Sequence, residues 1–329
     1  DPTGSEDICS FDQFEFRYAL PDFDANRLRP SEFLKLLRFI RLWRKLGWTI
    51  EHIDRAIAAL WPADQLPDAA DDEAARIAKL DAGFRVLIPR LAAVLETLDA
   101  LSLRAHRDLP ALLALWAPID THGPGSLYRQ MFLNPAILRQ DDVFREDGFG
   151  NYLNNPAETL AAHAGALRAA FNLTEDEFAL ILDDLNFDDT TPLSLTAISQ
   201  VFRRGYLARK LRMSVRELLA LQALSGLDPF AAPDPPHPAT LRFVRLAQTI
   251  KESPFKISRL LYLLRHDDLT GKASPNAASV RAFAKTIRDD LRRIEGEHVV
   301  QDDPTGELAR AKMALVYGNG VADTFFGLI

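Results

Sequence analysis

Apolar residues recur along this 329-residue chain at helical spacing, and strand-like alternation is rare. After residue 30, an apolar stripe follows the i, i+3, i+4, i+7 pattern of one helix face. The stripe consists of Phe33, Leu36, Leu37, Ile40 and Trp43. The pattern predicts a helix that is capped by Ser31 and packs this stripe inside the protein. A basic set lies off the stripe, on a second face: Lys35, Arg38, Arg41, Arg44 and Lys45.

This helix runs into a tight turn and then into a second amphipathic segment, in the sequence RKLGWTIEHIDRAIAAL (44–60). Thr49 is a natural helix N-cap because its hydroxyl can accept a hydrogen bond from the first turn. The same order recurs in RKLRMSVRELLALQAL (209–224) with Ser214 as the cap, and in FNLTEDEF (171–178) with Thr174. Glu217 and Glu177 complete capping boxes in these two copies, whereas His52 takes that position in the first.

Two looser copies place Ser102 and Lys256 at the cap position. The five cap positions are 53, 72, 40 and 42 residues apart, so the motif recurs without the fixed period of a solenoid. We expect the apolar residues beside these turns to be buried core anchors. They are Trp43, Trp48, Phe178, Leu211, Met213, Leu218 and Leu260.

The sequence therefore predicts an all-α fold, an irregular array of helix-turn-helix units. The aromatic segment FDQFEFRYAL (11–20) is the one place near the N-terminus where a short strand is expected. We expect an extended N-terminal segment at 1–30, a first helical block at 31–120 and a second at 121–329 that is truncated at its end. Segments rich in Pro and Gly separate the helices at 60–72, 117–126, 227–238 and 267–276.

Composition narrows the function classes. Hydrophobic residues make up 47% and charged residues 26%, as in an ordinary globular protein. The net charge of −7 argues against a protein built to neutralise many phosphates. The single Cys9 cannot form an internal disulfide. The longest apolar run, Leu109–Ile119, contains two prolines and is shorter than the roughly 20 residues of a membrane helix. No signal peptide is visible.

We find no pattern that predicts an enzyme, and we expect no catalytic, cofactor-binding or metal-binding residues. Single histidines such as His52, His106 and His163 are typical of packing or surface positions because no zinc-binding spacing surrounds them. The acidic pairs at 183–184 and 188–189 are expected to be solvated. An EF-hand alignment of 141–148 places Val143 and Arg145 at ligand positions and fails. The glycines at 318 and 320 lack the third glycine and the strand of a dinucleotide site.

A nucleic-acid function would need polar or basic residues at the start of a recognition helix. The helix after Thr49 offers Glu51, His52, Asp54 and Arg55, a mixed and partly acidic set. The corresponding helix after Ser214 is almost all Leu and Ala. The recurring motif therefore indicates packing, and only the basic face of the 31–46 helix stays open to a binding role.

Several long stretches of the chain resemble the A subunit of bacterial insecticidal toxin complexes (Tc toxins). They are the run 33–60, with FIRLWRKLGWTIEHID (39–54) at its centre, LALWAPIDTHGPGSLYRQMFLNP (113–135), FNLTEDEFALIL (171–182), LSLTAISQVFRRGYLARKLRMSVRELLALQALSGLDPF (193–230) and TLRFVRLAQTIKESPFKISRLLYLLRHDD (240–268). The chain departs from the family at Lys256, where a small capping residue is usual, and matches it weakly at 62–82.

The resemblance implies that this chain is part of the α-helical shell of a TcA-like subunit of a pore-forming, translocating toxin. Such subunits are secreted or lie on the bacterial surface, and they assemble as pentamers with partner subunits that supply a toxic enzyme. They attach to a host-cell receptor, and only regions absent from this chain would enter the membrane. No catalytic residue, cofactor or nucleic-acid contact is implied. Two alternatives stay open: a helical adaptor that binds a protein partner, and a helix-turn-helix nucleic-acid binder.

Overall fold

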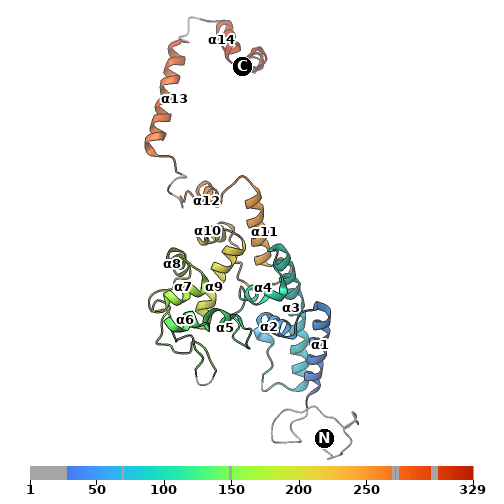
Figure 1. Ribbon diagram of the computed structural model, residues 1–329. Coiled ribbons are helices and arrows are strands. Elements are labelled where there is room, and N and C mark those ends of the chain that lie inside the picture. Colours follow the sequence, from blue (N-terminus) through green and yellow to red (C-terminus); the bar gives the residue numbers. More distant parts are fainter. Residues whose placement is uncertain are drawn as a thin grey trace, which may run out of the picture. The chain divides into compact units, whose positions relative to one another are not determined.

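The computed structural model describes residues 28–68, 70–147, 150–268, 271, 274–297 and 303–328, with the side chain of residue 295 left out. These residues form fifteen α-helices, one short 3-10 helix and no strand (Figure 1). The helices are α1 (Pro30–Leu46), α2 (Ile50–Leu60), η2 (Ala63–Gln65), α3 (Glu73–Ala100), α4 (Ala105–Leu113), α5 (Leu127–Phe132), α6 (Pro135–Gln140), α7 (Ala164–Phe171), α8 (Glu175–Asp184), α9 (Leu195–Lys210), α10 (Val215–Ser225), α11 (Ala239–Glu252), α12 (Ile257–Arg265), α13 (Ala277–Glu297), α14 (Glu307–Tyr317) and α15 (Asn319–Phe326).

The predicted all-α class is confirmed for this part of the chain. The strand expected at 11–20 lies outside the described residues. The four segments that we predicted as breaks between helices all fall between helices: α2–α3, α4–α5, α10–α11 and α12–α13. Proline and glycine in these segments disfavour a continuous helix, which is why their positions could be predicted from the sequence.

Contacts divide the chain into two compact units, Asp1–Asp267 and Asp268–Ile329. In the first unit, the long helix α3 is one centre of packing, and α1, α2, α4 and α11 lie against it. Helix α9 is the second centre, packed by α7, α8 and α10. Helix α11 also contacts α10 and so joins the two centres. The limits that we expect for the helical blocks, at 30/31 and 120/121, stay predictions.

Helix α9 supplies much of the core around it. Its inward residues include Ile198, Val201 and Leu207, all fully buried. Arg204 is also buried, and it pairs with Asp184 of α8 through Nε and Oδ2 at 2.7 Å. A buried guanidinium is stable only when its charge is paired. This ion pair therefore ties α8 to α9.

Six helix ends share a turn of three consecutive residues, which we call a corner. The first residue has a positive φ, the second is apolar, and the third begins the next segment. The corners are Gly47-Trp48-Thr49, Gly226-Leu227-Asp228, Ser102-Leu103-Arg104, Asn172-Leu173-Thr174, Asn186-Phe187-Asp188 and Arg212-Met213-Ser214. At the last four, the amide of the apolar residue donates to the carbonyl five residues earlier, at 2.8–3.0 Å. This Schellman bond folds the apolar residue back against the helix that it ends.

The caps at the corners follow the prediction at three places and differ at one. Thr174 and Ser214 each form a complete capping box, and Thr49 accepts only the bond from the His52 amide. Ser102 is not a cap, which corrects the prediction. It takes the left-handed position with φ of 54°, and Arg104 precedes the first turn of α4.

The predicted inward face of α1 is wrong. Leu36 is 52% exposed and Trp43 is 36% exposed, so Trp43 is not a core anchor. The opposite face packs on α3 because polar contacts orient the helix. The amide and hydroxyl of Ser31 donate to Glu73, and Arg38 pairs with Asp81. These bonds decide the orientation of α1, and the apolar periodicity alone does not contain them.

Of the other six predicted anchors, three are buried and three are not. Phe178, Leu211 and Leu218 are less than 9% exposed, as predicted. Trp48, Met213 and Leu260 are half-buried because corners and outer helices leave one side open. The anchors thus mark the helix-helix contacts correctly, although only some reach the centre of the core.

The second unit contains α13, α14 and α15, and α14 packs on α15. Among its described residues only Ala322 is buried. Large apolar side chains are exposed on all three helices: Val280, Phe283, Ile287, Leu291, Ile294, Leu308, Leu315, Val316, Tyr317, Val321, Phe325 and Leu328. Exposed apolar surface of this extent is typical of a region that contacts further protein.

Candidate functional site

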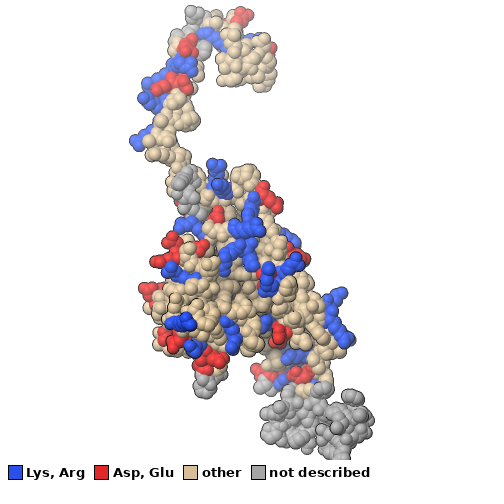
Figure 2. Space-filling view, in the orientation of Figure 1, with Lys and Arg blue, Asp and Glu red and all other residues tan. Residues whose placement is uncertain are grey.

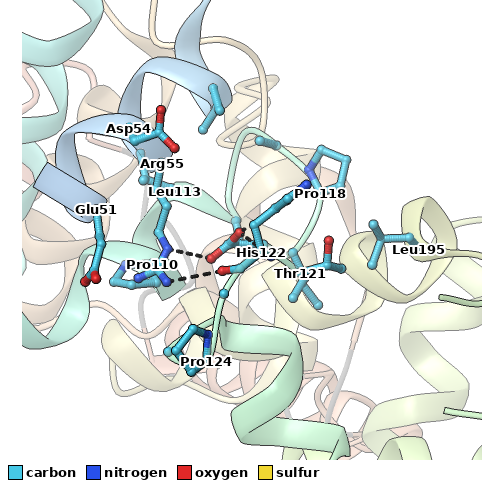
Figure 3. A pocket seen from close by; sticks show the side chains of 18 residues that line it. Glu51, Asp54, Arg55, Pro110, Leu113, Pro118, Thr121, His122, Pro124 and Leu195 are labelled. Atoms are coloured by element: carbon cyan, nitrogen blue, oxygen red, sulfur yellow. Dashed lines mark hydrogen bonds and ion pairs between the residues drawn. The ribbon is translucent and has the colours of Figure 1, made fainter. Parts of the chain in front are cut away.

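The helix that follows the first corner borders a cavity of about 430 Å³ between α2 and the loop at 117–125 (Figure 3). Arg55 of α2 pairs with Asp120 of this loop, with Nε and Oδ2 2.6 Å apart. Its Nη2 also donates to the carbonyl of His122 at 3.4 Å. The second carboxylate oxygen of Asp120 accepts the amide of His122 at 3.0 Å. Both oxygens of Asp120 therefore hold the loop in place.

The cavity brings together a histidine and an aspartate, His122 and Asp120, which could act in catalysis. Their geometry, however, is that of a loop support and not of a catalytic pair. The side chain of His122 is 96% exposed and its Nδ1 lies 3.9 Å from Asp120 Oδ1, too far for a hydrogen bond. A general base needs a hydrogen-bonded orienting group and a nearby nucleophile. Because Asp120 instead bonds Arg55 and the loop backbone, the arrangement fixes a loop on a helix.

The same contacts bear on nucleic-acid binding. Arg55, the basic residue at the start of the would-be recognition helix, is directed to Asp120, and its side chain is only 13% exposed. Glu51 and Asp54 line the same cavity and would repel phosphate. Figure 2 shows Lys and Arg side chains on the flank formed by α1 and a second group over α10 and α11. On α1, Arg38 is used in the ion pair with Asp81, and Arg41 is exposed.

A histidine clamp, formed by His163 between Asp141 and Glu158, is the most specific arrangement of titratable groups. Nδ1 of His163 lies 2.5 Å from Asp141 Oδ2, and Nε2 lies 2.9 Å from Glu158 Oε2. The His163 side chain is 13% exposed. Burial lowers the pKa of His163, but the hydrogen bonds to Glu158 and Asp141 outweigh it, so the pKa is raised above 6.5. Only the imidazolium can donate from both nitrogens, so the clamp favours the protonated form.

The clamp connects the end of α6 to the start of α7. Asp141 directly follows α6, and His163 directly precedes α7. Phe144, fully buried, stacks on Phe132 and has His163 at its edge, with ring centroids 6.2 Å apart. The clamp thus holds the irregular segment between α6 and α7 against the aromatic pair of Phe144 and Phe132.

Sequence reasoning did not detect this clamp. We expected His163 to be a packing or surface residue, and we tested Asp141 only as part of a calcium loop. The two carboxylates lie 22 and 5 residues from His163, and neither spacing corresponds to a face of a helix or strand. The folding of the 141–163 loop brings them together, and no local pattern encodes that path.

One member of each acidic pair that we tested for chemistry has a structural partner. Asp184 pairs with Arg204, and Asp188 accepts bonds from Thr190 within its own turn. Gly318 separates α14 from α15, a helix-helix turn with no strand before it in the described residues.

In the described part of the chain, no three His, Cys, Asp or Glu side chains are grouped to hold a metal ion. None of the described helices is both long enough and apolar enough to span a membrane.

No protein-family model, no curated protein and no solved structure matches the chain.

Proposed function

We propose that this chain is part of the α-helical shell of a TcA-like toxin subunit, where it forms a stiff wall. The observation that carries the proposal is the corner, which recurs at six helix ends with the same order of left-handed residue, apolar residue and next segment. Four of these corners, at 47–49, 172–174, 212–214 and 226–228, lie within the stretches that resemble the Tc toxins. In this proposal the shell turns from one helix to the next at these corners.

The corners give stiffness because each fixes the direction of two helices at once. A helix cap contributes about 0.5–2 kcal/mol to stability. At 174 and 214 the glutamate of the capping box also accepts the cap amide, at 3.0 Å in both places. The apolar residue beside the cap then packs on a neighbouring helix.

Long side chains add ties between helices that are distant in sequence. Arg209 of α9 donates to the carbonyl of Phe171 at 2.7 Å, at the end of α7. Lys210 pairs with Asp108 of α4 at 3.3 Å. Basic groups near helix ends interact favourably with free carbonyls, as at Phe171. These ties support a mechanical role, in which the wall keeps its shape while other parts of a larger protein move.

The complete coding sequence tests the proposal. We expect it to extend far beyond these 329 residues and to encode long channel-forming helices. The expected product is an oligomer that carries partner subunits and a host-cell binding region. A coding sequence that ends near residue 329 contradicts the proposal.

A helical adaptor that binds a protein partner is the second candidate, and the exposed apolar residues of the second unit favour it. Leu291 is 55% exposed and Phe283 is 67% exposed on one amphipathic helix. An adaptor would bind its partner as a separate 329-residue protein. In the shell proposal, further parts of the same polypeptide or of neighbouring subunits cover these residues. If the natural protein is no longer than this chain and forms a stable one-to-one complex with a partner, that result would favour the adaptor.

A nucleic-acid binder has no comparable support, since Arg55 is engaged by Asp120. Binding to duplex DNA at low salt is the direct test of this class. We expect no mobility shift. A shift that weakens with salt and is lost in Arg41→Gln/Arg44→Gln would contradict this expectation.

A further inference from the structure

A second cavity, of about 560 Å³, lies between α1, α2, η2 and α3. Its apolar lining consists mainly of Phe39, Ile57, Trp61, Leu66, Leu80 and Phe84. Since a cavity of roughly 150 Å³ can hold one benzene molecule, this one has room for a molecule of about three rings. The size and the apolar lining are those of a small-molecule site.

Two aromatic side chains of this lining are held in place by the residues around them. Trp61 meets Phe84 edge to face, with ring centroids 5.4 Å apart, and its indole nitrogen donates to the carbonyl of Gln65 at 3.2 Å. A β-carbon on Gly83 would lie 2.1 Å from the indole ring, so the indole fits against α3 because that position is a glycine. The Arg38 guanidinium lies over the Phe84 ring, 5.2 Å from its centroid. This wall of the cavity is therefore formed in advance, which reduces the entropic cost of binding a ligand.

The charged side chains at the cavity do not favour a charged ligand. Arg76 donates to the carbonyls of Asp71 and Asp68, both at 3.1 Å, and Lys79 pairs with the Asp71 carboxylate at 2.7 Å. These two basic groups are thus already engaged by the protein. When Asp71 is counted with the lining, the basic and acidic side chains are equal in number: Lys35, Arg76 and Lys79 against Glu32, Asp54 and Asp71.

We propose that this cavity binds a small, neutral aromatic molecule, a role beyond that of a shell wall. Phe39, Trp61 and Phe84 line the cavity, and aromatic rings pack favourably on one another in stacked or edge-to-face pairs. The indole nitrogen of Trp61 is already bonded to Gln65, so it is not available to a polar ligand. A charged ligand would lose its hydration without gaining a free partner of opposite sign, which disfavours its burial.

Two fluorescent probes with the same ring skeleton test the class of ligand on the intact chain. N-phenyl-1-naphthylamine is neutral, and 8-anilino-1-naphthalenesulfonate carries one added sulfonate. We expect saturable binding of the neutral probe at a single site and binding of the anionic probe that is weaker by about ten-fold or more. Absence of saturable binding of the neutral probe, or binding of the anionic probe that is equally tight or tighter, would overturn the proposal.

Matched substitutions locate the site. Leu66→Glu places a carboxylate on the exposed edge of the lining, and Ile88→Glu does the same on α3 outside it, at 57% and 56% exposure. Phe283→Glu makes this change on the exposed apolar surface of the second unit. We expect Leu66→Glu to weaken binding of the neutral probe several-fold and the other two variants to leave it unchanged.

Circular dichroism checks that the three variants stay folded. An affinity that is the same in Leu66→Glu as in the wild type, or that falls in Phe283→Glu, would overturn the proposal. Either result would leave the shell function untouched, because the shell role does not depend on a ligand.

Discussion

Leu173 of the α7–α8 corner lies directly against Gly205 of α9. A β-carbon placed on Gly205 would come within 2.8 Å of Leu173 Cδ2, closer than real side chains approach one another. Leu173 is 8% exposed and Gly205 is buried in the middle of α9. The apolar residue of this corner is thus packed onto a neighbouring helix at the one position where that helix has no side chain.

This packing predicts that Gly205→Ala destabilises the protein. The added methyl group must displace Leu173 or shift α9, and overpacking of this kind costs about 1–3 kcal/mol. Urea-induced unfolding measures the change in the free energy of unfolding. Gly165→Ala in α7 is the matched control, because its β-carbon would meet nothing within 4 Å. There we expect stabilisation of about 0.4–1 kcal/mol. Equal effects at both sites would contradict the packing.

The capping box at Ser214 predicts that the losses of stability caused by removing its two side chains are not additive. Ser214→Ala removes the acceptor for the Glu217 amide and the hydroxyl that donates to the Glu217 carboxylate, at 3.2 and 3.0 Å. We expect a cost of about 0.5–2 kcal/mol. Glu217→Ala should cost less, and the double variant less than the sum, because the two side chains bond each other. Strict additivity in a double-mutant cycle would show that the box is not formed.

The histidine clamp predicts a stability change with pH. The pKa of His163 is raised in the folded protein, because the bonds to Glu158 and Asp141 outweigh the effect of burial. The clamp therefore stabilises fully below the unfolded pKa of about 6.5, and its contribution is lost as the pH rises through the higher folded pKa. The difference in unfolding free energy between wild type and His163→Gln should shrink from pH 6 to pH 9.

His237→Gln, at an exposed histidine, is the control for this measurement. It should leave the pH profile of the wild type unchanged. A difference between wild type and His163→Gln that stays constant over this pH range would contradict the clamp.

Asp108 predicts the opposite pH response. Burial raises the pKa of Asp108, but bonds from the Arg104 amide and from the Arg107 and Lys210 side chains outweigh it, so the pKa is lowered. Its stabilisation is present above the unfolded pKa of about 3.9 and is lost as the pH falls through the folded pKa. Asp108→Asn should cost about 1–3 kcal/mol at neutral pH. The cost should vanish in acid, and a cost that persists there would be evidence against this ion pair.

Local patterns predicted the parts of the fold that depend on local chemistry. The hydroxyls of Thr49, Thr174 and Ser214 all cap helices, because a cap involves only residues three positions apart. The breaks between helices were equally predictable from proline and glycine. The all-α fold class could be predicted from the apolar periodicity, because each segment shows this periodicity by itself.

Features that depend on distant residues could not be predicted in this way. Ser31 was expected to cap α1, yet it lies within the helix and bonds Glu73, 42 residues away. Arg38 with Asp81 then turns the apolar stripe outward. The clamp at His163 has the same origin, since its partners meet only when the 141–163 loop folds. The periodicity of the sequence shows which face of a helix is apolar. It does not show which other part of the chain, if any, packs against that face.

Electron cryomicroscopy of the complete gene product tests the central claim most directly. The account predicts an oligomer in which the first unit, around α3 and α9, traces as part of an outer helical wall, with the corners at 47–49, 172–174 and 212–214 turned as described. A monomeric particle, or one in which these residues form a mobile module outside any wall, would contradict it.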